Sequence, residues 1–264
     1  MSQSFVSRIG GIVSADIAVP EHERVLRFYS RVLTTGDNPL WREDLMSNIG
    51  VPVIGVGART PEHSNLPVQW MPHIQVDDVA TSVARGRDLG GTELMHGKDD
   101  SGNSQWAVLL DPNGAAFGLV GLLEEVPRDA LPQQAPDDAG PVGRIPWLEL
   151  TVKEASASGD FYRQVVGWTI EEVEMTDADE RYADYNMLGG DGNPAAGVCH
   201  ARGVNLGVPP VWMIYLPVGD VTESIRRVSE EGGKIVKAPL GSNGVHSYAV
   251  VQDPVGGCVT LCSG

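Results

Sequence analysis

A short stretch in the second half of the chain gathers side chains that could bind a ligand or take part in catalysis. Residues 197–205 read GVCHARGVN, so a thiol, an imidazole and a guanidinium lie close together at Cys199, His200 and Arg202. Adjacent residues of a strand point to opposite faces, so Cys199 and His200 do not form a catalytic pair, and only one of them can face a cavity. An arginine can hold an anionic group through two parallel hydrogen bonds. We predict that His200 and Arg202 bind ligand, with a purely structural role as the alternative for His200.

Motifs typical of several other functional classes do not occur in the sequence. There is no GxSxG elbow and no dinucleotide fingerprint, and GGDG at 189–192 lacks the Lys-Ser/Thr of a phosphate-binding loop. The three cysteines form no CxxC, which argues against a zinc knuckle or a thioredoxin motif. With 35 acidic and 19 basic residues, the formal net charge is −16, which repels nucleic acid and anionic membranes. We expect neither as a partner, and we expect a monomer or a homodimer.

The same sequence predicts a cytoplasmic protein with reduced thiols. The N-terminus, MSQSFVSRIGG, has no apolar signal core, and no run of 18 apolar residues occurs anywhere. Cys258 and Cys262 lie four residues apart on one face of an expected strand, too far apart for a disulfide.

The elements that position these side chains are organised around a duplicated turn. Residues 106–119 read WAVLLDPNGAAFGL and residues 248–261 read YAVVQDPVGGCVTL, so Asp-Pro-x-Gly recurs after 142 residues. Proline presets φ for a turn, glycine tolerates positive φ, and the flanking β-rich runs predict a hairpin in each copy. The fixed spacing indicates an internal duplication.

Hydrophobic periodicity extends the duplication to the rest of the chain. Residues 12–19 predict a strand, Glu21–Leu33 an amphipathic helix, and Asp77 the N-cap of a second helix that ends at Gly90-Gly91. Each unit therefore reads as a strand, a helix and three strands, and the pattern returns 133 to 142 residues later. The nine extra residues of the second copy are assigned to an acidic loop around Glu171–Arg181. The Pro-rich stretch 126–143 predicts a linker between domains 1–125 and 144–264.

The unit resembles the vicinal oxygen chelate superfamily, which includes glyoxalase I, extradiol dioxygenases, fosfomycin-resistance enzymes and bleomycin-binding proteins. The resemblance rests on Phe-Tyr in the first helix, the Gly-Gly helix end and the DPxG hairpin, and it covers nearly the whole chain. It implies an α+β fold in which four βαβββ units pair into two curved, open eight-stranded barrels. Pairing within each half and pairing across the halves both remain possible.

The resemblance also implies where a metal ion would bind. The family takes its ligands from His or Gln in first strands and from an acid in last strands. The corresponding residues here are Ser14, Met71, Gly118, Trp147, Met213 and Thr260. None of these six is a usual ligand of a divalent ion. We therefore expect no metal and no other cofactor.

If those positions face the cavity, alternation along the strands brings other groups to the same faces. Asp16 and His73 then share the first cavity, and Glu149 and Tyr215 share the second. A carboxylate opposite an imidazole or a phenol could transfer protons, so we predict these four as catalytic residues. In the alternative, they only satisfy one another inside a partly polar barrel.

Aromatic residues near the same positions suit a planar or apolar small molecule. Trp106 and Tyr248 precede the two DPxG turns, and Trp147 stands at a metal position. We predict all three as ligand-binding residues, with core packing as the alternative.

Three functions follow from these features. The first is metal-independent binding of a small organic molecule for sequestration or resistance. The second is an enzyme of specialised metabolism, an isomerase, cyclase or lyase, that uses Asp16/His73 or Glu149/His200/Tyr215 for proton transfer. The third is a divalent-metal lyase or dioxygenase with relocated ligands at His200 and Glu149.

Overall fold

Each half of the chain folds into one sheet with its own pair of helices. The computed structural model describes residues 8–35, 41–42, 45–46, 53–123 and 145–263. The first half contains β1 (Ile12–Val19), α1 (His22–Val32), β2 (Trp41–Arg42), β3 (Leu45–Met46), β4 (Ile54–Ala58), the 3-10 turn η1 (Pro61–His63), β5 (Met71–Val76), α2 (Val79–Asp88), β6 (Thr92–Lys98), β7 (Ser104–Leu110) and β8 (Ala116–Gly121). The second half contains β9 (Leu148–Val152), α3 (Ala155–Val166), β10 (Thr169–Asp177), β11 (Glu180–Leu188), β12 (Pro194–His200), the 3-10 turn η2 (Gly203–Asn205), β13 (Trp212–Val218), α4 (Val221–Glu230), β14 (Lys234–Lys237), β15 (Tyr248–Gln252) and β16 (Cys258–Ser263).

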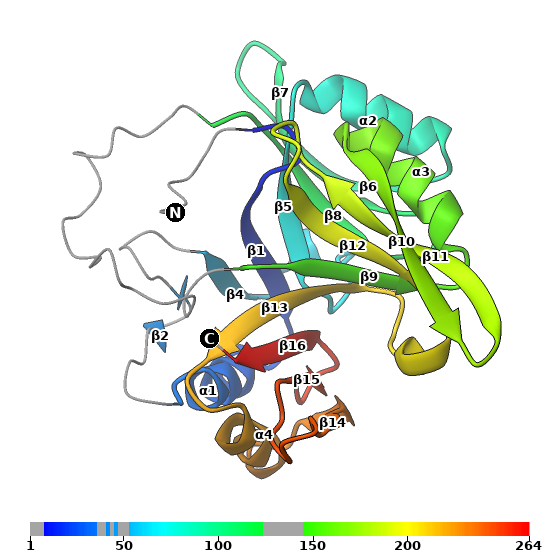
Figure 1. Ribbon diagram of the computed structural model, residues 1–264. Helices are drawn as coiled ribbons and strands as arrows, with labels where there is room; N and C mark the ends of the chain where they lie inside the picture. The colour runs from blue at the N-terminus through cyan, green and yellow to red at the C-terminus, as the bar shows by residue number, and fades with distance from the viewer. Residues whose placement is uncertain (1–7, 36–40, 43–44, 47–52, 124–144, 264) are drawn as a thin grey trace, which may run out of the picture.

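The two units of each half pair with each other. The first sheet has the order β2-β3-β4-β1-β5-β8-β7-β6, and the second has the order β10-β11-β12-β9-β13-β16-β15-β14. In both, the first strands of the two units run antiparallel at the centre, β1 beside β5 and β9 beside β13. The prediction of four βαβββ units in two curved, open eight-stranded sheets is confirmed, and the pairing lies within the halves (Figure 1).

Two local expectations need correction, and one falls outside the described residues. The N-cap of α2 is Asp78 rather than Asp77, because β5 continues to Val76 and the Asp78 carboxylate accepts a hydrogen bond of 2.6 Å from the backbone N of Thr81. The acidic insertion is not a loop: it is the long hairpin β10–β11, paired from Thr169–Leu188 to Asp177–Glu180. Residues 126–143, the expected linker, lie outside the described part of the chain.

The residues that recur in both copies contact one another at the junction of the halves. Tyr29 on α1 donates a hydrogen bond of 3.0 Å to the carboxylate of Asp253, the aspartate of the DPxG turn in the other half. The indole of Trp70 donates to the same Tyr29 hydroxyl over 2.9 Å, and all three side chains are buried. The other half repeats the arrangement with Tyr162, Asp111 and Trp212. Each half therefore supplies a tyrosine to the turn of the other.

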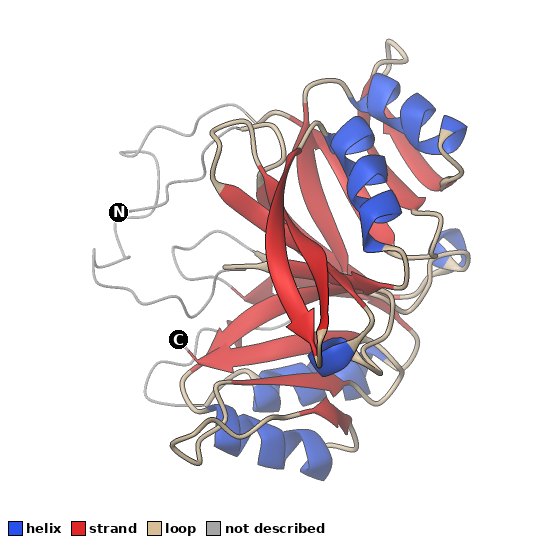
Figure 2. Ribbon diagram, turned by 45° about the vertical axis from the view of Figure 1, so that its right-hand side comes forward, coloured by secondary structure: helices blue, strands red, loops and turns tan. Residues whose placement is uncertain are grey.

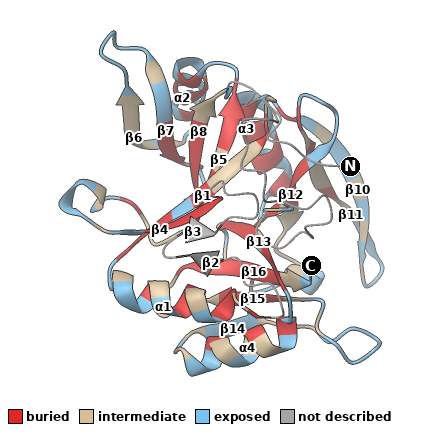
Figure 3. Cartoon of the chain, turned by 90° about the vertical axis from the view of Figure 1, so that its left-hand side faces the viewer, coloured by how far each residue is buried: buried red, intermediate tan, exposed pale blue. Residues whose placement is uncertain are grey.

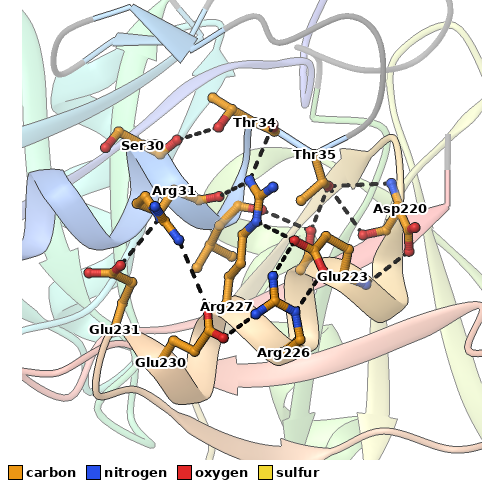
Figure 4. Close-up of polar contacts among 12 residues, drawn as sticks. Ser30, Arg31, Thr34, Thr35, Asp220, Glu223, Arg226, Arg227, Glu230 and Glu231 are labelled. Atoms are coloured by element: carbon orange, nitrogen blue, oxygen red, sulfur yellow. Dashed lines mark hydrogen bonds and ion pairs between the residues drawn. The ribbon is translucent and has the colours of Figure 1, made fainter.

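Helices from different halves lie side by side, α2 with α3 and α1 with α4 (Figures 1 and 2). Between α1 and α4, the Ser224 hydroxyl donates a hydrogen bond of 2.8 Å to the carbonyl of Val32. The guanidinium of Arg227 donates to the carbonyl of Arg31 over 2.9 Å, and Arg27 pairs with Glu231 (Figure 4 shows the neighbouring contacts of this interface). These contacts join the halves through helices, while each sheet stays within its own half.

The apolar core continues from one half into the other. Buried residues of both halves form a single cluster that includes Phe28, Trp70, Phe161 and Trp212. Figure 3 shows burial concentrated along the central strands, with exposed residues along the β10–β11 hairpin and the loops. Within the described residues, no helix has both the length and the apolar character needed to cross a membrane.

Candidate functional site

A cavity of about 600 Å³ lies against the first sheet. Strands β1, β4, β5, β7 and β8 contribute its walls, and His63 and Leu66 close one side. Apolar side chains, among them Met71, Met95 and Trp106, make up most of the lining. The indole of Trp106 is 40% exposed and lies against Gly97, where a Cβ atom would come within 2.2 Å of the ring. Gly97 therefore allows Trp106 to lie flat along the cavity wall.

The polar end of this cavity is built by residues of β1 and β5. Ser14 lies opposite His73 in the sheet, and its hydroxyl is 2.9 Å from Nδ1 of the imidazole. The other nitrogen, Nε2, is 3.6 Å from the carboxylate of Asp16. Burial lowers the pKa of His73, and the nearby Asp16 carboxylate opposes this shift. The imidazole is therefore neutral at pH 7, with one nitrogen held by Ser14 and the other directed toward Asp16.

His73 fills the space in which the resembling family would place a carboxylate ligand. It lies opposite Gly118 on β8, and a Cβ atom at position 118 would come within 2.4 Å of Cδ2 of the imidazole. No side chain larger than glycine fits at position 118 without moving His73. Among the described residues, no three His, Cys, Asp or Glu side chains lie close enough together to hold a metal ion. The residues present thus do not fit the metal site that the resemblance implies.

A second group of polar side chains occupies the equivalent face of the second sheet. Burial raises the pKa of the Glu149 carboxyl, and the neighbouring Tyr215 and Trp147 side chains and the Lys237 charge oppose that shift. Burial, followed by the Glu149 charge, raises the pKa of the Tyr215 phenol. Lys237 in turn lies 5.5 Å from the ring of Tyr248. The structure thus brings Glu149, Tyr215 and Trp147 together and places Tyr248 beside them.

Asp184 on β11 joins this group and was missed in the sequence. Its carboxylate accepts hydrogen bonds from the backbone N of His200 at 2.8 Å and lies 3.1 Å from the imidazole Nδ1. It also lies beside Cys199, whose pKa is raised first by burial and then by Glu149 and Asp184, so that the thiol stays protonated. Because 171–181 was predicted to be a loop, β11 was not predicted as a strand, and the face on which Asp184 lies could not be assigned.

Arg202 and His200 lie at the edge of this group rather than at its centre. The guanidinium of Arg202 pairs with Glu180 at 2.8 Å and Asp177 at 3.5 Å, and it stacks 4.3 Å from the ring of Tyr182. These contacts tie the β10–β11 hairpin to the end of β12. Asp16, His73 and Trp106 lie in the other sheet, so the predicted site residues form two separate groups.

Comparison with protein families and with known proteins gives consistent results. A glyoxalase-like domain matches residues 13–120, and a domain of the glyoxalase/bleomycin resistance protein/dioxygenase superfamily matches residues 144–259. The chain is 25% identical over 248 residues to "Putative glyoxylase CFP32" of Mycobacterium tuberculosis, covering 91% of this chain and 90% of that protein. It is 27% identical over 180 residues to the anthracycline biosynthesis protein DnrV of Streptomyces peucetius, covering 67% and 60%.

Solved structures show the same fold at low sequence identity. A mutant of 4-hydroxymandelate synthase from Streptomyces coelicolor superposes with a TM-score of 0.55 at 13% identity, covering 97% of this chain and 93% of that one. At this identity the similarity concerns the arrangement of the strands and helices alone.

Proposed function

The chain belongs to the glyoxalase/bleomycin resistance protein/dioxygenase superfamily, with two such domains in tandem, and on this basis we propose that it binds a small organic molecule in the first-domain cavity without a metal ion. The observation that carries the proposal is the His73 imidazole over Gly118, in the space of the family's carboxylate ligand. A neutral hydrogen-bonding group there replaces the Lewis acid that a metal ion would supply.

The shape and lining of the cavity define the class of ligand. A volume of about 600 Å³ suits a molecule of drug size, since such pockets commonly span roughly 300–1,000 Å³. The Trp106 indole and the methionine side chains favour a flat, largely apolar body. His73 and Asp16 favour one polar group at the end of that body.

The similarity to a protein named for anthracycline biosynthesis supports a ligand from specialised metabolism. Anthracyclines contain a planar polycyclic core, and such a core matches a cavity walled by Trp106 and methionines. We propose that the protein sequesters a metabolite of this kind and thereby protects the cell from it.

A titration with 1,8-dihydroxyanthraquinone tests this assignment. Quenching of the intrinsic tryptophan fluorescence should reveal saturable binding to the wild type, measured with a chelator present. Trp106→Ala should weaken binding about tenfold or more, because the largest aromatic surface of the cavity is lost. Leu89→Ala removes an exposed apolar side chain outside the cavity and serves as the matched control. Equal affinities of the wild type and Trp106→Ala would place the ligand elsewhere.

A second candidate function is proton transfer in an enzyme of specialised metabolism. It draws support from Glu149, whose pKa is raised by burial and so moves toward neutrality, and from His73, whose lowered pKa keeps its imidazole available as a neutral base. If Glu149 acts as a general base, Glu149→Gln should lower turnover roughly a hundredfold while leaving ligand binding nearly intact. A ligand recovered chemically unchanged after long incubation with the wild type would contradict this candidate.

The third candidate, a metal-dependent lyase or dioxygenase, has less support from the side chains in place. His200 contacts Asp184 at the edge of the second group, and Glu149 lies beside Tyr215 and Trp147. We derive no reaction step through a metal ion, because the described residues do not form a set of ligands for one.

A further inference from the structure

The second sheet carries a band of polar side chains on the face opposite its helices. Glu149 and Thr151 alternate along β9 with the buried Leu148, Leu150 and Val152, so they share that face. Strands β11, β12, β9, β13 and β16 are neighbours in the sheet, as Figure 1 shows. In that strand order, the band consists of Asp184, Cys199, Glu149 with Thr151, Tyr215 and Thr260. Register confirms the sequence of neighbours, because Cys199 pairs with Thr151 and Tyr215 pairs with Thr260.

Three oxygen atoms of this band have no hydrogen-bond partner among the residues that the structure describes. They are Oγ1 of Thr151, Oγ1 of Thr260 and Oδ2 of Asp184. Thr260 is 0% exposed, Thr151 1% and Asp184 4%, so bulk water does not reach these oxygen atoms to hydrogen-bond with them. Buried polar atoms are nearly always paired in folded proteins, so three orphaned oxygens on one face call for an occupant, ordered water or a ligand, that hydrogen-bonds to them.

The first sheet lacks these groups at the equivalent positions. The duplication, with its offsets of 133 and 142 residues, relates Thr151 to Ala18, Cys199 to Gly57 and Thr260 to Gly118. Ala18 and Gly57 line the apolar cavity of the first domain. The second domain thus replaces small apolar residues by hydroxyl and thiol groups at the same places, which fits a ligand of different polarity.

The charges of the band indicate the charge of the ligand that it would bind. Glu149 and Asp184 are two carboxylates close enough to influence each other electrostatically. In the described part of the chain, two basic side chains lie near these carboxylates: His200 contacts Oδ1 of Asp184, and Lys237 donates to the Val204 carbonyl and lies over the Tyr248 ring. The thiol of Cys199 and the phenol of Tyr215 are uncharged. A group that donates hydrogen bonds and carries positive charge complements such a band.

We propose that this face of the second sheet binds the protonated amino group of a small molecule, with the carboxylates of Glu149 and Asp184 and the hydroxyls of Thr151 and Thr260 as acceptors. The rings of Trp147, Tyr215 and Tyr248 lie on or beside the band and can contact the ammonium and the carbon skeleton next to it. Val204, 70% exposed, accepts a hydrogen bond from Lys237, which also lies over the Tyr248 ring, so its apolar side chain can contact the body of a ligand beside the band. The site is separate from the cavity assigned to the planar ligand and does not depend on that assignment.

Phenethylamine is the probe, and 2-phenylethanol is its uncharged counterpart of the same size. Isothermal titration calorimetry on the full chain should show saturable binding of the amine and binding of the alcohol weaker by about tenfold or more, since hydrogen bonds to a charged group are the stronger ones. Equal affinity for the two compounds, or no binding of the amine, would overturn the proposal.

Thr260→Val is the decisive variant because it keeps the shape of the side chain and removes the orphaned hydroxyl. It should weaken amine binding several-fold, while the melting temperature of the ligand-free protein stays equal or rises, because a buried unpaired hydroxyl is removed. Thr176→Val, on the exposed side of β10, is the matched control and should leave both unchanged. A purely structural Thr260 would lower the melting temperature on substitution and leave amine affinity as it was, which contradicts the site.

Asp184→Asn removes one of the two charges and should weaken amine binding more strongly than alcohol binding. Trp106→Ala separates the two sites: it weakens 1,8-dihydroxyanthraquinone binding and not phenethylamine binding, whereas Thr260→Val does the reverse. Loss of amine binding in Trp106→Ala would place the amine in the first domain and overturn the proposal, whatever the outcome for the planar ligand.

Discussion

At the scale of single residues, His73 and Gly118 define the first cavity together. The imidazole can lie over β8 only because position 118 has no side chain, and Ser14 holds its Nδ1 at 2.9 Å. An acidic side chain at position 118 would overlap sterically with the imidazole at position 73. Both residues could be assigned to their strands from the sequence, yet their contact depends on the register of β5 against β8, in which His73 lies opposite Gly118.

Gly118→Ala should therefore destabilise the protein by about 1–3 kcal/mol, because the new methyl group would overlap the imidazole. The double variant Gly118→Ala/His73→Ala should recover much of this loss, since the space is then free. Gly121→Ala on the same strand is the control, because a Cβ atom there meets no atom within 4 Å. Urea unfolding of the wild type, Gly118→Ala, His73→Ala and the double variant gives the four free energies of the cycle, and strictly additive losses would show that the two residues do not share this space.

The lowered pKa of His73 makes part of the stability depend on pH. The unfolded chain binds a proton at His73 near the ordinary pKa of 6.5, whereas the folded chain binds it only at lower pH. The contribution is therefore complete above about pH 6.5 and is lost as the pH falls from there toward the folded pKa, by at most about 1.4 kcal/mol per pH unit.

His73→Gln removes this titration. Between pH 7.5 and 5.5, the free energy of unfolding of the wild type should fall more steeply than that of His73→Gln, as urea titrations at several pH values would measure. Parallel curves for the two proteins would mean that folding does not disfavour the protonated imidazole.

At the scale of elements, each duplicated motif turns out to serve the contact between the halves. The tyrosine of the Phe-Tyr pair, the tryptophan before the second unit and the aspartate of DPxG meet in one buried network. The sequence showed that these residues recur, and the strands, the α1 helix and the turns were predictable from periodicity and turn residues. Their meeting across the halves was not predictable, because nothing in a local pattern encodes which unit lies next to which.

Tyr29→Phe and Tyr162→Phe should each cost about 1–2 kcal/mol of unfolding free energy, because each leaves a buried aspartate and a buried indole N–H with one partner fewer. Urea unfolding measures the loss. Tyr182→Phe, at a half-buried ring on the β10–β11 hairpin, is the control and should change little. Tyrosine variants as stable as the wild type would show that these hydrogen bonds do not hold the halves together.

The β10–β11 hairpin was not predictable from the sequence. Val173 and Met175 alternate with acidic residues, but no residue of β10 is buried, so its alternation lacks the apolar contrast of a strand with one face in the core. Asp184, in the middle of β11, was therefore not predicted as a site residue. On the core strands β9 and β13, buried residues flank Glu149 and Tyr215, so alternation along the sequence was enough to assign these two side chains to a face.

At the scale of the whole molecule, two sheets share one core. Because α1 packs on α4 and α2 on α3, the halves remain in contact without sharing strands. Stable association of the halves therefore does not require exchange of strands between them.

Limited proteolysis should first cleave the Pro-rich stretch 126–143, whose composition predicts a linker between the two domains. The two fragments should still elute together in size-exclusion chromatography, because the core and the tyrosine contacts span the halves. First cleavage within 12–121, or fragments that separate without denaturant, would contradict the boundary or the shared core respectively.

The central claim, binding of an organic molecule in the first domain without a metal ion, is tested most directly by native mass spectrometry. The purified protein is incubated with cell extract in the presence of a chelator, desalted and weighed intact beside Trp106→Ala. We predict one added organic mass per wild-type chain, no added metal mass, and loss of that adduct in Trp106→Ala. An adduct that forms only when the chelator is omitted, together with one Zn, Ni, Mn or Fe per chain, would contradict the claim.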